Sequence, residues 1–179
     1  MKFSIEKNTL LTQLQILSKA IPTRSTLPII SCALFTHKNN GLKIRTTDLE
    51  ISISLNCSVE NGTDGSVAVP MQKLLEITHA MPESMIHFTV SDIGKVNIDC
   101  ETGHYTIMGQ AVDEFPAEQV IENGQSFTVS TEELRDIINS TSYAASKDDM
   151  KPVLQGVLFQ VGKDGFVSVA TDGHRLVKL

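Results

Sequence analysis

The sequence predicts an α+β fold made of repeated modules, in each of which a strand, a helix and several antiparallel strands follow one another. Three observations predict it. Short runs alternate apolar with polar residues, apolar residues recur at helical spacing directly after three of these runs, and turn-forming segments separate most of the others.

The first run and the residues after it predict a strand followed by an amphipathic helix. Phe3 and Ile5 alternate with polar residues, as in a strand with one buried face. Apolar residues at helical spacing then follow, namely Leu10, Leu11, Leu14, Leu17 and Ile21.

Strands are expected next at residues 29–36, 41–46 and 50–59, with "KNNG" as the hairpin turn between the first two. The pattern then starts again. Val67 and Val69 alternate, Pro70 lies at a helix start, and a helical stripe of Leu74, Leu75 and Thr78 follows. The strands predicted in this second half are 66–69, 85–91, 95–101 and 104–109, with "DIGK" and "ETGH" as turns.

A third strand and helix are predicted in "SFTVSTEELRDIINSTSYA". Ser130 or Thr131 can cap the helix, and Glu133 can complete a capping box. Three apolar residues at helical spacing, Leu134, Ile137 and Ile138, are expected to face inward.

The third pattern repeats the first at a fixed offset of 124 residues (127 minus 3). Residues 3–55 and 127–179 align as 53 pairs without a gap, and eleven pairs are identical, whereas ordinary composition gives roughly three. The identical pairs are Phe3/Phe127, Leu10/Leu134, Ser18/Ser142, Ala20/Ala144, Pro28/Pro152, Leu34/Leu158, Phe35/Phe159, Gly41/Gly165, Thr47/Thr171, Asp48/Asp172 and Leu55/Leu179. The repeat indicates an internal duplication.

The duplication predicts two domains. Residues 1–123 form a complete first domain, and residues 124–179 supply 56 of the 124 residues of a second, its N-terminal half. We expect this half domain to lack its second helix and the strands that follow, and so to expose a sheet edge and an apolar face.

Composition excludes several classes of protein. The net charge is −6, from 15 Lys and Arg against 21 Asp and Glu, so a nucleic acid cannot be held by global attraction and requires a local basic patch. The three cysteines show no CxxC spacing, which predicts buried thiols in a reducing compartment. No run reaches the ~18 apolar residues of a membrane span, and a cytoplasmic protein is expected.

"VSVATDGHRLVKL", residues 167–179, is the segment whose chemistry is least obvious. Thr171, Asp172 and Gly173 favour a tight turn, and the matching Thr47 and Asp48 of the first module lack the Gly and His that follow. One reading is purely structural, with a half-buried His174 and an Arg175 whose stem covers apolar surface.

A catalytic reading pairs Asp172 with His174, but no GxSxG elbow and no cysteine in a cationic setting supplies a nucleophile. A metal site is not indicated, because the five histidines show no HxxxH or HxH spacing, and no phosphate-binding or dinucleotide glycine pattern is present. We therefore expect no catalytic residue, no metal and no cofactor.

The third reading is a surface groove for a short peptide with hydrophobic anchors. In it, a strand containing Leu154 and Leu158 pairs with the strand before the turn. Arg175 and His174 then form a polar rim beside an apolar floor.

The chain strongly resembles the bacterial DNA polymerase III beta subunit family, the replicative sliding clamps, along its whole length. The stretches that carry the resemblance are "MKFSIEKNTLLTQLQ", "RSTLPIISCALF", "TTDLEISI" and "KPVLQGVLFQVGKDGFVSVATDGHRLV". The resemblance implies the DNA clamp fold, with two helices and two antiparallel sheets in each complete domain. It also implies three domains per subunit and a head-to-tail homodimer that encircles duplex DNA.

The resemblance further implies the site residues and partners. Helices line the hole of such rings, which makes Arg24, Lys73, Lys19 and Arg135 the DNA-binding candidates. The peptide-binding cleft, where the DNA polymerase III catalytic subunit, the clamp loader and other clamp-motif proteins dock, carries over to Leu154, Thr171, Gly173, His174, Arg175 and Leu176.

Two other functions remain open from the residues alone. One is a small hydrolase that uses Asp172 and His174 as a general-base pair. The other is a repeat-built interaction module without a DNA partner.

Overall fold

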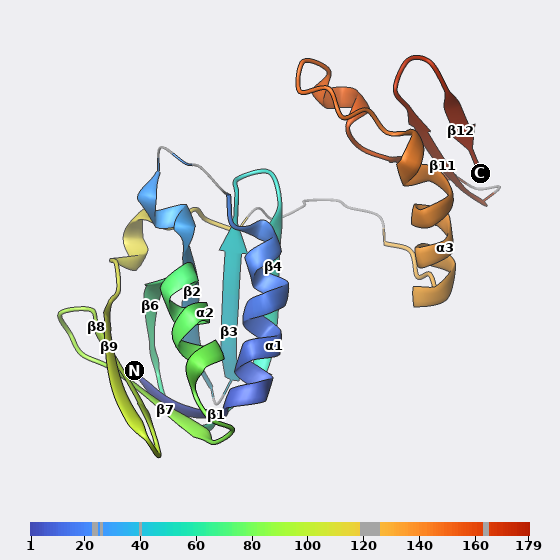
Figure 1. Ribbon diagram of the computed structural model, residues 1–179. Helices are drawn as coiled ribbons and strands as arrows, with labels where there is room; N and C mark the ends of the chain where they lie inside the picture. Colours follow the sequence, from blue (N-terminus) through green and yellow to red (C-terminus); the bar gives the residue numbers. More distant parts are fainter. Residues whose placement is uncertain (23–24, 26, 40, 119–125, 163–164) are drawn as a thin grey trace. The chain divides into compact units, whose positions relative to one another are not determined.

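The computed structural model describes residues 1–22, 25, 27–39, 41–118, 126–162 and 165–179, and it divides into two compact units, Met1–Gln119 and Val120–Leu179. The predicted boundary between residues 123 and 124 lies outside the described residues. The units are drawn in Figure 1, and each is described here by itself.

Unit 1, Met1–Gln119, contains two helices and nine strands among its described residues. They are β1 (Lys2–Glu6), α1 (Lys7–Leu17), β2 (Cys32–Lys38), β3 (Gly41–Thr47), β4 (Ser52–Ser58), β5 (Glu60–Thr63), β6 (Gly65–Pro70), α2 (Met71–Ala80), β7 (Met85–Val90), β8 (Lys95–Cys100) and β9 (Gly103–Met108). Short 3-10 helices cover Ser18–Ala20, Pro28–Ser31 and Val112–Glu114.

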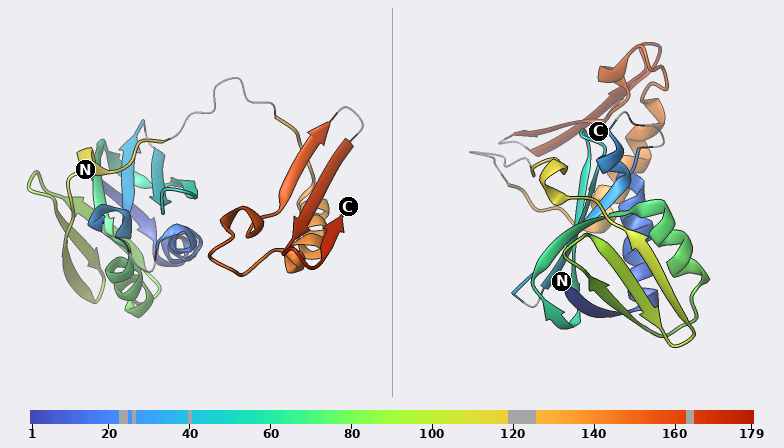
Figure 2. Two further views of the ribbon diagram at one scale, coloured as in Figure 1. Left: turned by 90° about the horizontal axis from the view of Figure 1, so that it is seen from above. Right: turned by 90° about the vertical axis from the view of Figure 1, so that its left-hand side faces the viewer.

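The strands of unit 1 form two antiparallel sheets, with the orders β5-β1-β7-β8-β9 and β4-β3-β2-β6. Helices α1 and α2 contact each other and lie side by side over the strands (Figures 1 and 2). The predicted α+β class, with antiparallel sheets and two helices in a complete domain, is confirmed for this unit.

Three stacked phenylalanines join the two sheets in the core of unit 1. Phe3 of β1 lies 4.6 Å from Phe88 of β7 and 6.3 Å from Phe35 of β2, measured between ring centroids. All three rings are at most 2 % exposed. Leu10, Leu14 and Leu17 of α1, predicted to face inward, are fully buried in the same cluster.

Two strand predictions in unit 1 were partly wrong. Residues 29–31 belong to a 3-10 helix, because Pro28 starts a turn in which the Cys32 amide donates to the Ile29 carbonyl, and the strand begins only at Cys32. The single strand predicted at 50–59 is β4, and the chain then crosses into the other sheet as β5, whose polar sequence "ENGT" gives no alternation signal.

Unit 2, Val120–Leu179, has one helix and one three-stranded antiparallel sheet in its described part. Its elements are α3 (Thr131–Thr141), β10 (Leu158–Gly162), β11 (Gly165–Thr171) and β12 (Leu176–Lys178), with 3-10 helices at Ser142–Ala144 and Pro152–Leu154. The capping box predicted for α3 is present, since the Ser130 hydroxyl accepts from the Glu133 amide and the Glu133 carboxylate accepts from the Ser130 amide.

Three elements of unit 1 have counterparts in unit 2 with the same bounds at the predicted offset of 124. Helix α1 maps onto α3, the 3-10 turn after α1 maps onto the one after α3, and β3 maps onto β11, each without a shift at either end. The strand registers agree as well: Leu34 pairs with Arg45, and Leu158 pairs with Val169. The structure thereby confirms the predicted duplication.

The strand expected at residues 127–129 was a wrong prediction, since these residues are not in a strand. In unit 1 the matching strand β1 pairs with β5 and β7. The described part of unit 2 contains no counterpart of β7, so the segment has no neighbour to pair with.

Candidate functional site

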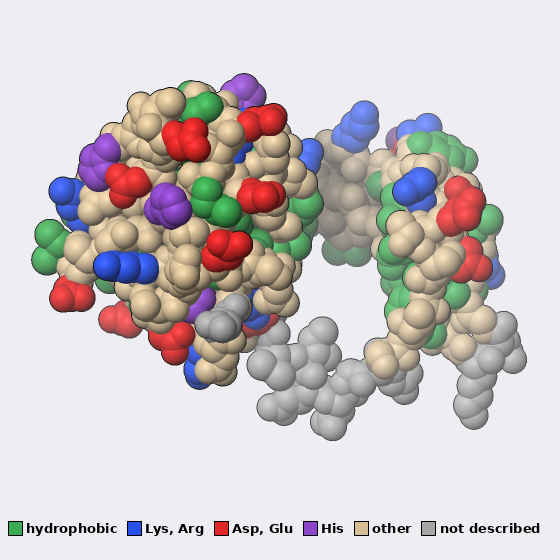
Figure 3. Space-filling view, turned by 90° about the horizontal axis from the view of Figure 1, so that it is seen from below, with side chains coloured by type: hydrophobic (Ala, Val, Ile, Leu, Met, Phe, Trp, Pro, Cys, Tyr) green, Lys and Arg blue, Asp and Glu red, His purple; other side chains and the backbone are tan. Residues whose placement is uncertain are grey.

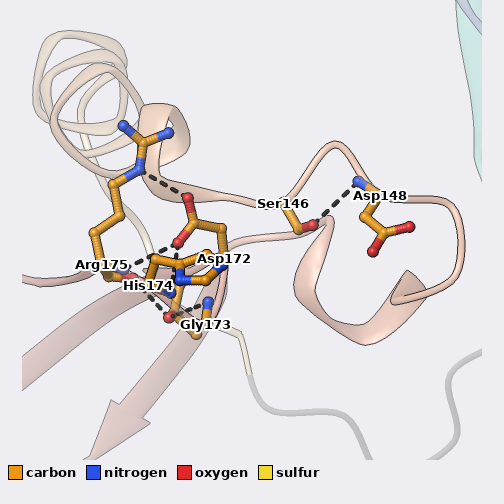
Figure 4. A network of polar contacts seen from close by, with 7 residues as sticks. Ser146, Asp148, Asp172, Gly173, His174 and Arg175 are labelled. Atoms are coloured by element: carbon orange, nitrogen blue, oxygen red, sulfur yellow. Dashed lines mark hydrogen bonds and ion pairs between the residues drawn. The ribbon is translucent and has the colours of Figure 1, made fainter.

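The candidate site of unit 2 is the tight turn Thr171–Leu176 between β11 and β12. The Thr171 hydroxyl donates to the Arg175 carbonyl (2.6 Å) and accepts from the Gly173 amide (3.1 Å). Gly173 has a φ of +92°, a conformation that favours glycine. Figure 4 shows how these bonds close the turn around Asp172.

Asp172 holds the turn through both of its carboxylate oxygens. Oδ1 accepts from the amides of His174 (2.9 Å) and Arg175 (3.0 Å), and Oδ2 accepts from the Arg175 Nε (2.9 Å). Hydrogen bonds from these two amides, together with the nearby guanidinium, lower the pKa of Asp172 to about 2. The carboxylate is therefore ionised at neutral pH and committed to the backbone.

Unit 1 contains the same turn without the Gly, His or Arg. Thr47 donates to the Ile51 carbonyl (2.9 Å), and the Asp48 Oδ1 accepts from the amides of Glu50 and Ile51. Leu49 occupies the Gly173 position with a φ of +82°. The Thr-Asp pair consequently builds the turn in both units, and the residues that differ between them are available for another purpose.

His174, Arg175 and Leu176 are the distinguishing residues of the turn in unit 2. All three side chains are exposed, Leu176 at 65 %. The Arg175 guanidinium lies 5.7 Å from the ring centroid of Tyr143, in cation–π geometry. The turn therefore exposes a cation beside an aromatic ring, together with an imidazole and an apolar side chain.

Tyr143 is a residue that the sequence reasoning missed. It lies in the 3-10 turn after α3 and matches Lys19 in the repeat, so its position carried no local signal of a binding role. The repeat does contain a signal for Tyr143, because an aromatic ring replaces the cation of Lys19 at this pair.

Leu154 departs from the expectation. It was predicted to lie on a strand paired with the strand before the turn, but it lies in the 3-10 helix Pro152–Leu154, and pairing begins only at Leu158. Pro152 starts this turn as Pro28 starts its counterpart. The Leu154 carbonyl accepts from the Ser146 amide (2.8 Å). In the same loop the Ser146 hydroxyl accepts from the Asp148 amide (Figure 4), and the Asp148 carboxylate accepts from the Met150 amide.

The geometry argues against the hydrolase reading. The bonds of Asp172 reach the backbone amide of His174 rather than its imidazole, so the carboxylate does not orient that ring as a general base. Cys32 and Cys57 are buried free thiols whose pKa is raised by burial, which makes them poor nucleophiles. Within the described ranges, no cluster of three or more His, Cys, Asp or Glu side chains is arranged to hold a metal ion.

The predicted DNA-side cations are exposed where they are described. Lys19 lies in the 3-10 turn after α1, Lys73 lies on α2, and Arg135 lies on α3 in unit 2. Arg24 lies outside the described residues. Lys73 lies on α2, which contacts α1, and Lys19 directly follows the end of α1.

The helices differ in the charge around these cations. Helix α1 has no acidic residue and α2 has one, Glu76, whereas α3 carries Glu132, Glu133 and Asp136 around Arg135. On the face drawn in Figure 3, acidic and basic side chains of unit 1 are interspersed, so that face forms no single-sign field. The helix pair of unit 1 is the better candidate for a polyanion.

No described helix is long and apolar enough to cross a membrane. The described residues define a class: a repeat-built α+β protein with an exposed Thr-Asp turn whose Gly, His and Arg occur in only one of the two units. Residues 1–119 match the family model of the DNA polymerase III beta subunit, N-terminal domain, and residues 128–178 match that of its central domain. The chain belongs to the DNA polymerase III beta subunit family.

Individual relatives agree with this assignment. The chain is 30 % identical over 179 residues to the beta sliding clamp of Pseudomonas putida, with 98 % of the chain and 48 % of the relative covered. All of the chain superposes on half of the DNA polymerase III subunit beta from Pseudomonas aeruginosa, with a TM-score of 0.92 and 29 % identity. The polymerase III beta of Caulobacter crescentus gives 0.90, with 25 % identity and coverage of 100 % and 50 %. The chain spans about half the length of the curated relatives it matches.

Proposed function

We propose that the chain is part of a sliding clamp, a non-catalytic processivity factor that encircles duplex DNA and tethers the replicative polymerase. The observation that carries the proposal is the match of both units, in order, to the N-terminal and central domains of the beta subunit. In this proposal residues 1–123 form the first clamp domain, and residues 124–179 form the first half of the second.

Encirclement is compatible with an acidic protein. A closed ring holds DNA topologically, so its inner wall needs only weak contacts with phosphates and no reading of bases. We assign Lys19, Lys73, Arg24 and Arg135 to that wall. The absence of acidic residues on α1 supports this assignment for unit 1, and the three acids on α3 make Arg135 the weakest of the four.

We assign the peptide-binding cleft to Leu154, Thr171, Gly173, His174, Arg175 and Leu176, with Tyr143 as an added wall. The repeat supports this choice, because the unit 1 turn has the same backbone bonds but carries Glu50 and Ile51 where unit 2 has His174 and Arg175. The proposed occupants are short hydrophobic motifs of the DNA polymerase III catalytic subunit, the clamp loader and other clamp-binding proteins. The proposal needs no cofactor, and it places the protein in the cytoplasm as a full-length homodimer.

Encirclement can be tested with a complete ring. Residues 1–179 are joined to the second half of the Pseudomonas putida relative, and the hybrid is loaded by a clamp loader onto nicked circular DNA and washed with high salt. We expect retention on circular DNA and loss after linearisation, because only topology survives salt. A hybrid of dimer mass that binds both forms alike would contradict encirclement.

The DNA-side cations can be tested on the 179-residue chain itself. Anisotropy of a labelled duplex at low salt should show weaker binding for Lys73→Glu and Lys19→Glu, because each variant loses a phosphate contact. Each phosphate contact also adds about 0.9 to the slope of the logarithm of the binding constant against the logarithm of the salt concentration. The control is Lys95→Glu, an equal charge change at an exposed position on β8 rather than on the helices. Equal losses for Lys73 and Lys95 would indicate unspecific attraction.

The cleft can be tested in the hybrid with a short peptide that has two apolar anchors and one carboxylate. Arg175→Ala should weaken binding about tenfold, as expected for one lost charge-assisted bond. Lys178→Ala, an exposed charge on β12, is the control. If Arg175→Ala leaves the affinity unchanged, the peptide binds at another site.

A further inference from the structure

In unit 1 the residues that follow β9, Gln110–Glu118, cross one face of the sheet β4-β3-β2-β6 and are here called the strap (yellow in Figure 1). The strap begins beside β6, where Gln110 and Ala68 exchange two amide hydrogen bonds of 2.8 and 3.3 Å. It ends beside β3, where the Glu118 carboxylate accepts from the Lys43 Nζ (2.7 Å). Since β2 lies between β6 and β3, the strap passes over β2.

The strap buries a single residue. Phe115 is 7 % exposed, whereas every other residue of the strap is exposed or half-buried. Its ring completes a small apolar cluster on this face of the sheet, separate from the main core of unit 1. The other members of the cluster are Ile29, Ile30, Cys32 and Ala68, with Leu34 packed against them. One aromatic anchor therefore holds a segment of nine residues.

Arg45 of β3 lies beside this anchor with its charge largely removed from water. The residue is 8 % exposed, its guanidinium carbon lies 5.1 Å from the centroid of the Phe115 ring, and one terminal nitrogen donates to the Pro116 carbonyl (2.5 Å). Among the described residues Arg45 forms no ion pair. Burial of a cation without a carboxylate partner costs free energy. This cost offsets part of what the burial of Phe115 contributes, and opening of the strap returns the guanidinium to water.

We propose that the strap opens reversibly and that the groove beneath it then binds a segment of a partner protein with one aromatic anchor and acidic flanks. The strap itself is the template for such a segment, because its aromatic ring is flanked by three carboxylates, those of Asp113, Glu114 and Glu118. The groove offers the complementary features, which are the apolar cluster, the edge of β6 that Gln110 occupies, and the cations of Lys43 and Arg45.

The strap and the partner segment compete for one groove. The apparent affinity of the partner is therefore its intrinsic affinity multiplied by the fraction of molecules in which the strap is open. This competition reverses the usual effect of a truncation, since loss of the Phe115 ring should strengthen the binding of the partner. The inference concerns unit 1 alone and does not rest on the proposed function.

Cys32 reports the opening of the strap, because it is buried in the cluster that Phe115 completes. The native 179-residue chain is alkylated with iodoacetamide, and the modified thiols are located by peptide mass mapping. Phe115→Ala should raise the rate at Cys32 about 10- to 100-fold, the population change expected for one buried aromatic side chain. Glu118→Lys, which breaks the exposed ion pair with Lys43, should raise it about two- to fivefold. Cys57, buried in the main core, is the internal control and should stay protected.

The groove is then probed with the strap sequence as a free peptide, QAVDEFPAE, in isothermal titration calorimetry. The peptide should bind Phe115→Ala about 10- to 100-fold more tightly than it binds the wild type, and it should slow the alkylation of Cys32 in that variant. Ile93→Ala, a truncation at an exposed position, is the control variant and should bind as the wild type does. A peptide whose phenylalanine is replaced by alanine is the control ligand and should not bind.

Three results would overturn the proposal. The first is an unchanged rate of alkylation at Cys32 in Phe115→Ala while Cys57 stays protected. The second is equal affinity of the peptide for the wild type and Phe115→Ala, or no binding to either. The third is equal binding of the peptide that lacks the aromatic ring. If Cys57 also loses its protection in Phe115→Ala, that variant is unfolded. Glu118→Lys then takes its place, and an unchanged rate at Cys32 in Glu118→Lys also overturns the proposal.

Discussion

Gly173→Ala should destabilise unit 2 by about 1–2 kcal/mol, the cost of placing a Cβ in a left-handed backbone conformation. Gly173 has a φ of +92°, and a Cβ added there meets no described atom within 4 Å. The cost is therefore conformational and includes no clash. Leu49 at +82° shows that the same turn can bear this strain, so the variant should fold with the turn intact.

The assay exploits the two tyrosines of the chain, Tyr105 in unit 1 and Tyr143 in unit 2. In a Tyr105→Phe background, urea unfolding followed by tyrosine fluorescence reports unit 2 alone, at a protein concentration low enough to exclude self-association. Gly156→Ala is the matched control. A Cβ there also meets no described atom within 4 Å, and its φ is not positive, so this change should be neutral or stabilise by about 0.4–1 kcal/mol.

The reciprocal change tests the same reasoning in unit 1. Leu49→Gly relieves the strain at φ +82° and should stabilise unit 1 by up to about 1 kcal/mol. The stabilisation that the half-exposed Leu49 side chain provides is lost in the same change and reduces this gain. Tyr105 is the reporter in a Tyr143→Phe background. If Gly173→Ala and Gly156→Ala have equal effects, backbone strain is not what selects glycine in the turn, and the argument fails.

Three further predictions concern the core, a helix cap and pH. Phe3→Ala should lower the free energy of urea unfolding of unit 1 by about 3–5 kcal/mol. Ile93→Ala, at a turn position that is 77 % exposed, should lower it by less than about 0.5 kcal/mol. Similar losses for the two variants would contradict the stacked core. Ser130→Ala removes the hydroxyl that caps α3 and should lower the free energy of unfolding of unit 2 by about 1 kcal/mol. The measurement is urea unfolding followed by Tyr143 fluorescence, and Ser140→Ala on the same helix is the control. The pKa of Asp172 is depressed from 3.8 to about 2. The contribution of this carboxylate to the free energy of unfolding of unit 2 is therefore complete above about pH 4 and is lost as the pH falls through about 2. A pH titration of the His174 amide by NMR should show this transition, and Asp172→Asn should abolish it.

Much of the fold was predictable because the repeat supplies each pattern twice. Helices α1 and α3 contain the apolar residues predicted at helical spacing from Leu10 and from Leu134. The capping box of Ser130 with Glu133 is a local signal that needs no tertiary partner. The Thr-Asp turn was also predictable, since the Thr171 hydroxyl and the Asp172 carboxylate both bond backbone groups within four residues.

The failures have a common physical origin, because they depend on partners distant in sequence. Val129 alternates as a strand residue should, yet a strand requires a neighbour, and the described part of unit 2 provides none. Leu154 was expected on a strand because its neighbours are apolar, but Pro152 makes that stretch a 3-10 turn. Tyr143 approaches Arg175 across 32 residues of chain, a proximity that no local pattern encodes.

The pairing of β1 with the distant strand β7 has a consequence for biosynthesis. Strand β1 cannot be completed until residues 85–90 have emerged from the ribosome, about 80 residues later. At about 5–20 residues per second this is a wait of roughly 4–16 s, during which Phe3 and Ile5 are available to chaperones and to neighbouring nascent chains. Strand β1 is thus made early in unit 1, but its pairing with β7 is delayed until the second half of the unit has been made.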